Sequence, residues 1–206
     1  GGYQSSTRAS TPRIFHHGAP NRMKTLVIVF AFFVSGSVYA EAFFAQMVLQ
    51  GVTFQVESPN DSSINPVTLR AETEDGQFGS VETEADGSIT NVEIGDLNVD
   101  GYPEIYVYVT SAGSGSYGSL IAYASNQNRS VSEIYLPPID EGTAEAEGYM
   151  GHDEFALVEN TFVRRFPVYR ANDPNAAPSG GTRQIQYKLE AGEAGWILRQ
   201  DQVIEY

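Results

Sequence analysis

The chain of 206 residues contains no cysteine. This absence excludes disulfide-stabilised folds, zinc sites built from cysteine thiolates, and cysteine nucleophiles. Basic residues are also scarce, since 12 Lys and Arg stand against 26 Asp and Glu and give a net charge of −14. Such an acidic chain argues against a nucleic-acid partner, because phosphates are bound through Lys and Arg. It favours a soluble protein whose partner, if charged, is basic.

Long hydrophobic runs are missing as well, with one short exception from Leu26 to Val34. A run of this length is too short for a membrane anchor, which needs about 20 apolar residues. It follows Met23-Lys24 and precedes small residues, so we predict a secretory signal peptide over residues 23–40, cleaved before Glu41. Residues 1–22 are predicted to be an upstream disordered or non-native segment.

Removing residues 1–40 leaves eight basic and 26 acidic residues, a net charge of −18, and a single histidine, His152. Residues 41–206 show no internal repeat and no interdomain linker, and they are predicted to form one domain. An exported protein of this size without cysteine fits the bacterial periplasm. The predicted location is therefore the periplasm of a Gram-negative bacterium, reached by the Sec route and without a membrane anchor.

The hydrophobic pattern after residue 41 alternates with a period of two. Short alternating runs rich in β-branched and aromatic residues are separated by Asp-Gly and Gly-rich turns, which predicts an all-β antiparallel sandwich or flattened barrel. A short helix is expected over Glu41–Gln50, a loop or single helical turn over Glu141–Met150, and a surface loop over Ala171–Gly181. The predicted strands are Val67–Glu72, Ser88–Ile94, Glu104–Thr110, Ser119–Ser125, Val131–Leu136, Glu154–Glu159, Phe162–Tyr169, Gln184–Leu189 and Trp196–Ile204.

A glycine-rich segment, Gly113-Ser114-Gly115-Ser116-Tyr117-Gly118, follows one of these strands. Its G-x-G-x-x-G spacing does not predict a dinucleotide site, because a strand and not a helix follows it. Two interpretations stay open: a structural hairpin connection, or a flexible binding loop that presents hydroxyls and a tyrosine ring.

Oxygen-bearing residues alternate at Asp96, Asn98 and Asp100, directly before Gly101. The spacing resembles the start of a calcium loop, but Val107 occupies the twelfth position, where an EF-hand has a bidentate Glu. We favour a turn in which these side chains bond their own backbone, with a calcium site as the alternative.

Two further features are interpreted as structural. His152 with Asp153 and with Ser114 or Ser116 suggests a hydrolytic triad, but no nucleophile elbow is present, so a hydrogen-bonded structural histidine is expected. Arg164 and Arg165 are adjacent on a strand, so at most one of them is buried, and pairing with local carboxylates is expected.

The export signal, the missing cysteine, the Asp96–Tyr102 pattern before a strand, and Ser114-Gly115-Ser116-Tyr117 together resemble the periplasmic inhibitors of invertebrate-type lysozyme, the PliI family. The resemblance extends over roughly residues 57–206. It implies a β-sandwich, often dimeric, that inserts a loop into the cleft of an invertebrate-type (i-type) lysozyme. It also implies a binding protein without enzymatic activity and without a cofactor.

The matching inhibitory residues here are Ser114 and Tyr117, within the loop Ser114 to Gly118, and Tyr149 and His152 are predicted as a second contact. Such a loop suits a muramidase cleft, because hydroxyls can donate to the catalytic carboxylates and a ring can occupy a sugar subsite. The alternative function is a calcium-binding cell-envelope or adhesion module that uses Asp96, Asn98 and Asp100. A hydrolase that uses His152 is a third hypothesis.

Overall fold

The computed structural model describes residues 42–206, so the predicted upstream segment and signal peptide lie outside the described residues. The regular secondary structure of the described residues is almost entirely strand. Their bounds are β1 Phe43–Leu49, β2 Val52–Ser58, β3 Ile64–Thr73, β4 Gly76–Asp86, β5 Ser88–Gly95, β6 Glu104–Thr110, β7 Gly118–Asn126, β8 Ser130–Tyr135, β9 Glu154–Val158, β10 Thr161–Pro167, β11 Thr182–Ala191 and β12 Trp196–Glu205.

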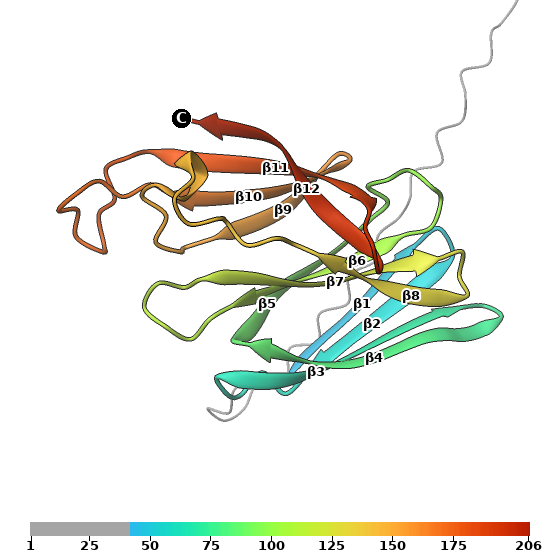
Figure 1. The fold of residues 1–206 in the computed structure, drawn as a ribbon. Helices are drawn as coiled ribbons and strands as arrows, with labels where there is room; N and C mark the ends of the chain where they lie inside the picture. Colours follow the sequence, from blue (N-terminus) through green and yellow to red (C-terminus); the bar gives the residue numbers. More distant parts are fainter. Residues whose placement is uncertain (1–41) are drawn as a thin grey trace, which may run out of the picture.

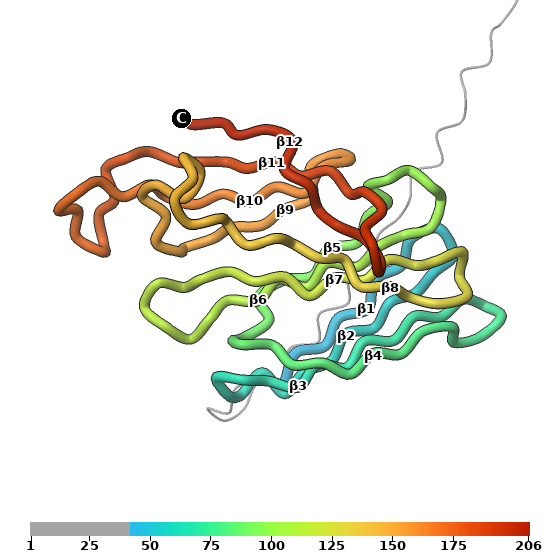
Figure 2. Tube along the Cα trace, viewed as in Figure 1, coloured from blue at the N-terminus to red at the C-terminus, as the bar shows by residue number. Residues whose placement is uncertain are grey.

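Two sheets make three layers of strands. One sheet has four strands in the order β1-β2-β3-β4, and the other has eight in the order β5-β6-β7-β8-β12-β11-β10-β9. The larger sheet folds back on itself, so that β5–β8 lie in the middle, with β1–β4 on one side and β9–β12 on the other (Figure 1). The backbone trace in Figure 2 shows the same arrangement.

Strand β6 is the centre of the fold because both of its faces are covered. Ile105, Val107 and Val109 belong to the core shared with β1–β4. Tyr106 and Tyr108 point the other way, as alternation along a strand requires, and belong to the core shared with β9–β12. The strand is thus buried from Glu104 to Val109, which fixes the positions of the loops at its two ends.

The eight-stranded sheet nearly closes into a flattened barrel. Strands β8 and β12 pair in parallel, with Trp196 opposite Ile134. The sheet's two edge strands, β5 and β9, are bridged by Glu93, whose carboxylate accepts a hydrogen bond from the Leu157 N–H at 3.0 Å. The all-β antiparallel fold predicted from the alternating pattern is confirmed, with this parallel pair as an added feature.

The helix expected over Glu41–Gln50 is wrong, because Phe43–Leu49 forms strand β1. Its residues include good helix formers, yet Gln50 (φ 51°) and Gly51 (φ 78°) both have positive φ, as a tight type I′ hairpin requires. This turn pairs β1 with β2 along its whole length, and the pairing overrides local propensity.

Strands β2 and β4 were not predicted from the sequence. Strand β4 is mostly exposed or half-buried, so its hydrophobic alternation is weak. The predicted surface loop over residues 171–181 is confirmed, and the 141–150 segment holds one short 3-10 turn, η1 Ala144–Ala146. Across residues 42–206, no helix has the length and apolar character that a membrane crossing demands.

Candidate functional site

The glycine-rich segment connects β6 to β7 at one end of the molecule, at the left in Figure 1. The Ser111 N–H donates to the Tyr117 carbonyl at 2.9 Å, and the Tyr117 N–H donates to the Ser111 hydroxyl at 3.0 Å. These bonds close the base of the loop. Ser114 at its tip is exposed, and 47% of Tyr117 is accessible to solvent.

A second loop, residues 148–153, packs against the first. The His152 N–H donates to the Gly115 carbonyl at 2.8 Å, and the Gly118 N–H donates to the Asp153 carboxylate at 2.7 Å. The Tyr117 ring meets the Tyr149 ring edge-on, with centroids 5.7 Å apart. We call residues 111–118 and 148–153 together the twin-loop surface.

Two glycines allow this close approach. Gly151 has φ +85°, and a Cβ there would lie 2.2 Å from the Gly115 carbonyl oxygen. A Cβ on Gly115 would lie 2.4 Å from the Tyr117 ring. Each glycine is therefore needed for packing: Gly151 brings the two loops together, and Gly115 leaves room for the Tyr117 ring.

A buried ion pair anchors the twin-loop surface to the sheet. Arg164 on β10 donates from Nε to Asp153 at 2.7 Å, and the two side chains are 7% and 0% exposed. Tyr149 donates from its hydroxyl to Asp153 and accepts from Arg164, both at 2.7 Å. Burial by itself would lower the pKa of Arg164, but the Asp153 carboxylate outweighs it and raises that pKa above its usual range.

At the opposite end of β6, the Asp96–Gly101 segment forms the predicted turn. The Asp96 carboxylate accepts the N–H groups of Asp100 and Gly101, each at 3.0 Å. The Tyr102 N–H donates to Asp100 at 2.8 Å. Side chains that bond their own backbone in this way confirm the interpretation as a turn.

The first residue of β6, Glu104, lies beside this turn and was missed from the sequence. Its side chain is fully buried. Its carboxylate and those of Asp96 and Asp100 have oxygens within 4.8 Å of one another. Burial raises the pKa of Glu104 to about 8, and the charges of Asp96 and Asp100 contribute to the rise. An alternating strand predicts which face Glu104 occupies but not that a second layer covers this face.

Residues 66–140 match the model of the PliI family, described as periplasmic lysozyme inhibitor of I-type lysozyme. The resemblance to the PliI family is thereby confirmed over this segment. No curated protein matches the chain. The PliI match supports a lysozyme-inhibitor role in general.

The PliI segment runs from β3 to just beyond β8 and includes one of the two loops of the twin-loop surface. Ser114, Gly115, Ser116, Tyr117 and Gly118 lie inside it. The second loop, with Tyr149 and His152, lies outside the match but is in direct contact with the first.

Hydrogen bonds hold the loop at Ser111, Gly115, Tyr117 and Gly118, and both interpretations of it, a structural connection and a binding loop, stay open. The role of the predicted inhibitory residues stays a prediction.

His152 was expected to be hydrogen-bonded through its ring. Instead the ring stacks on Tyr169 with centroids 6.2 Å apart, and Nε2 is buried without a partner in residues 42–206. Asp153, the acid expected to complete a triad with His152, is bonded to Arg164, Tyr149 and Gly118 instead. The hydrolase hypothesis therefore finds no catalytic arrangement in the described residues.

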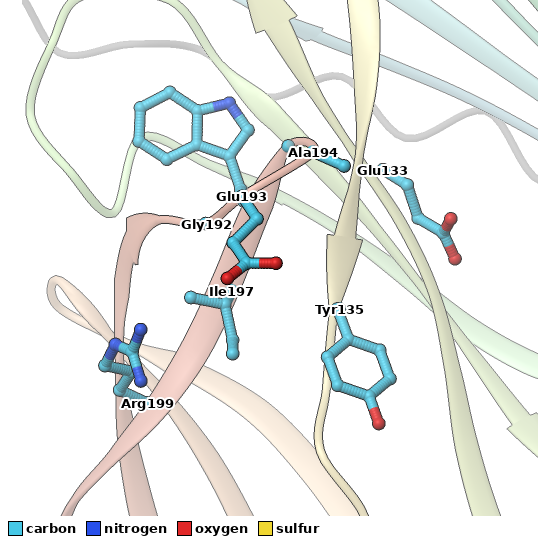
Figure 3. A pocket seen from close by; sticks show the side chains of 9 residues that line it. Glu133, Tyr135, Gly192, Glu193, Ala194, Ile197 and Arg199 are labelled. Atoms are coloured by element: carbon cyan, nitrogen blue, oxygen red, sulfur yellow. The ribbon is translucent and has the colours of Figure 1, made fainter.

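A hollow of about 440 Å³ lies between β8 and the β11–β12 hairpin, away from the twin-loop surface (Figure 3). Among its lining side chains, Glu193 and Arg199 come from the hairpin and its strand, and Glu133 and Tyr135 come from β8. Arg199 is already paired with Glu190 at 2.9 Å, and both are more than half exposed. Since no buried polar group of the lining points into it, we assign this hollow no function.

Proposed function

We propose that this protein inhibits i-type lysozyme in the periplasm by inserting the β6–β7 loop into the muramidase cleft. The observation that carries the proposal is the twin-loop surface, where exposed Ser114 and Tyr117 stand on a hydrogen-bonded support inside a PliI segment. The family match supports the general role. The loop, the residues and the preference for the i-type enzyme are our proposal.

The chemistry of the loop suits the cleft of a glycoside hydrolase. Such a cleft holds two carboxylates, one of which stays protonated, and subsites that stack sugar rings. The Ser114 hydroxyl can donate to the ionised carboxylate, and the Tyr117 ring can occupy a subsite. Both groups are exposed, so neither has to be uncovered before binding.

The support beneath the loop favours tight binding. A loop already held in one conformation loses less entropy on association than a mobile one. Here Asp153 and His152 form hydrogen bonds to the loop, and the Tyr149 ring packs against the Tyr117 ring. The net charge of −18 after residue 40 would speed the encounter with a cationic lysozyme more than it would raise affinity.

The experiment is a peptidoglycan lysis assay, titrated against invertebrate-, chicken- and goose-type lysozymes. Wild-type protein should inhibit the invertebrate type at stoichiometric concentration. The double variant Ser114→Ala, Tyr117→Ala should inhibit at least a hundredfold more weakly, as expected when two central contacts of an interface are lost. Its melting temperature should fall only slightly, because Ser114 is exposed and Tyr117 is half exposed, with one ring contact to Tyr149.

The matched control is Ser80→Ala, Tyr206→Ala, which removes the same two groups from exposed positions outside the twin-loop surface. It should inhibit like wild type. A loop variant that inhibits as well as this control would show that the loop is not the inhibitory element. Failure of wild type to inhibit any of the three lysozymes would refute the proposed function itself.

The homodimer implied by the family resemblance stays a prediction. Sedimentation equilibrium would test it, with the mass of one chain contradicting it. The absence of nucleic-acid and membrane partners also stays a prediction, drawn from the acidic composition and the predicted cleavage.

A further inference from the structure

Glu104 is a buried carboxylate without a full set of partners. Its side chain is 0% exposed, and Oε1 has no hydrogen-bond partner among residues 42–206. The other oxygen, Oε2, accepts the Leu97 N–H at 2.9 Å and the Tyr106 hydroxyl at 3.4 Å. No Lys or Arg of the described chain forms an ion pair with it. A carboxylate buried in this way is costly unless a positive charge accompanies it.

Two further carboxylates lie beside Glu104 and increase this cost. One oxygen each from Asp96, Asp100 and Glu104 lies within 4.8 Å of the others. Their repulsion adds to desolvation, and together these effects raise the pKa of Glu104 to about 8. A cation bound between the three carboxylates would offset both the desolvation of Glu104 and the repulsion among them.

We propose that Asp96, Asp100 and Glu104 bind one calcium ion. Calcium–oxygen distances are about 2.3–2.6 Å, so ligand oxygens of one ion lie no more than about 5 Å apart, as these three do. Asp96, Asp100 and Glu104 also follow the spacing of positions one, five and nine of a calcium loop. Asn98 and the Tyr102 carbonyl stand at positions three and seven, which supply further oxygens in such loops.

Calcium fits this set better than magnesium. The donors are all oxygen, and calcium accepts an irregular shell of six to eight ligands. Magnesium demands a nearly ideal octahedron and gives up its water reluctantly. Glu104, whose side chain reaches into the site from strand β6, is the ligand that separates this arrangement from an ordinary capped turn.

The ion would act on stability and not on the lysozyme-binding loop. The Gln50 side-chain amide, in the β1–β2 turn, donates to the Asp96 carboxylate at 2.7 Å. This hydrogen bond connects the β1–β4 layer to the Asp96–Gly101 turn of the middle layer. The twin-loop surface lies at the other end of β6, seven residues or about 20 Å away. This site therefore belongs to the fold of the proposed inhibitor, and it does not require a separate adhesion module.

The first test is calorimetric titration of the metal-free full-length protein with calcium chloride. We expect one ion per chain with a dissociation constant of about 10⁻⁴ M, the range of extracellular calcium sites. At a hundredfold excess over this constant, the melting temperature should rise by about 5–10 °C. Magnesium at the same concentration should produce a clearly smaller shift.

The second test uses Glu104→Gln and reads the order of melting temperatures. In chelator near neutral pH, the variant should melt at about the wild-type temperature, because a pKa of about 8 leaves Glu104 mostly protonated and glutamine replaces a neutral acid of the same shape. In calcium the variant should melt below the wild-type temperature, because it loses a charged ligand. Asp100→Asn, at an exposed position that does not endanger folding, should weaken calcium binding at least tenfold. Asp75→Asn, in the exposed β3–β4 turn, is the matched control and should bind like wild type.

A calorimetric trace without binding up to 10 mM calcium, together with unchanged melting temperatures, would overturn the proposal and identify Glu104 as a neutral buried acid. Calcium binding that survives both Glu104→Gln and Asp100→Asn would place the ion elsewhere and overturn it too. Lysozyme inhibition should be equal in calcium and in chelator at 25 °C. If the wild-type protein fails to inhibit lysozyme both in calcium and in chelator, the result counts against the proposed function and not against the ion site.

Discussion

One fully buried carboxylate lies near each end of strand β6, and the two carboxylates have different partners. Asp153, beside the β6–β7 loop, accepts three hydrogen bonds of 2.7 Å, one of them from the Arg164 guanidinium. Glu104, at the start of β6, receives one bond of ordinary length, and one of its oxygens has no partner in residues 42–206. A buried acid with a counter-charge holds structure together, whereas one without it is a place for a cation or a proton.

This difference explains why the two loops are suited to different tasks. In the twin-loop surface, the buried Asp153 charge is balanced by Arg164, and the exposed groups are neutral hydroxyls and the Tyr117 ring. Such a surface suits a protein partner. The Asp96–Glu104 end gathers three carboxylates and no basic side chain within the described residues, which suits a metal ion.

The largest expected effect is the removal of Asp153. Asp153→Ala leaves Arg164 buried without its partner, which should lower the free energy of unfolding by about 3–5 kcal/mol in urea denaturation. Inhibition should fall as well, because the Gly118 N–H loses its acceptor. Because Glu104 has no ion-pair partner to leave behind, Glu104→Gln in chelator should lower the free energy of unfolding far less than Asp153→Ala does.

The control for this experiment is Asp173→Ala. Asp173 also accepts several hydrogen bonds, from Arg170 and Ser179, but it lies on the exposed 171–181 loop. Asp173→Ala should lower the free energy of unfolding clearly less than Asp153→Ala, because water can replace the hydrogen bonds of Asp173. Equal losses for Asp153→Ala and Asp173→Ala would mean that the buried pair does not anchor the loops.

An intermediate effect is expected for Gly115→Ala. The added methyl group would lie 2.4 Å from the Tyr117 ring and must push the ring aside. We expect inhibition to weaken about tenfold, equal to about 1.4 kcal/mol of binding free energy, with a small change in melting temperature. Ala112→Gly, a change of similar size at an exposed position near the base of the same loop, is the control. If Gly115→Ala inhibits as well as wild type, the Tyr117 ring does not contribute to the contact with lysozyme.

The smallest effect is expected for an exposed ion pair. Glu190 and Arg199 lie 2.9 Å apart, about as close as Asp153 and Arg164, but both are more than half exposed. Glu190→Gln should therefore change the free energy of unfolding by no more than about 0.5 kcal/mol. A loss of several kcal/mol would show that contact distance, and not burial, sets the strength of ion pairs in this protein.

Much of the fold was predictable because strand alternation is a local property. The runs at Glu104–Thr110 and Gln184–Leu189 alternate clearly, and both are strands in the structure. Residues 43–49 were wrongly predicted to be helical because Ala, Gln, Met and Leu favour a helix. Only pairing with β2 makes them a strand. The burial of one of the two adjacent arginines was also predictable, since neighbours on a strand point to opposite faces.

The sequence by itself determined the alternating pattern, the acidic charge and the composition of the Ser114–Tyr117 loop, because these are properties of neighbouring residues. The tertiary structure decided which of these residues meet. Gly118 and Asp153 are 35 positions apart, and Gln50 and Asp96 are 46 apart, yet each pair forms a hydrogen bond of 2.7 Å. Local patterns give the face on which a side chain lies, but only the packing of the layers determines what covers that face.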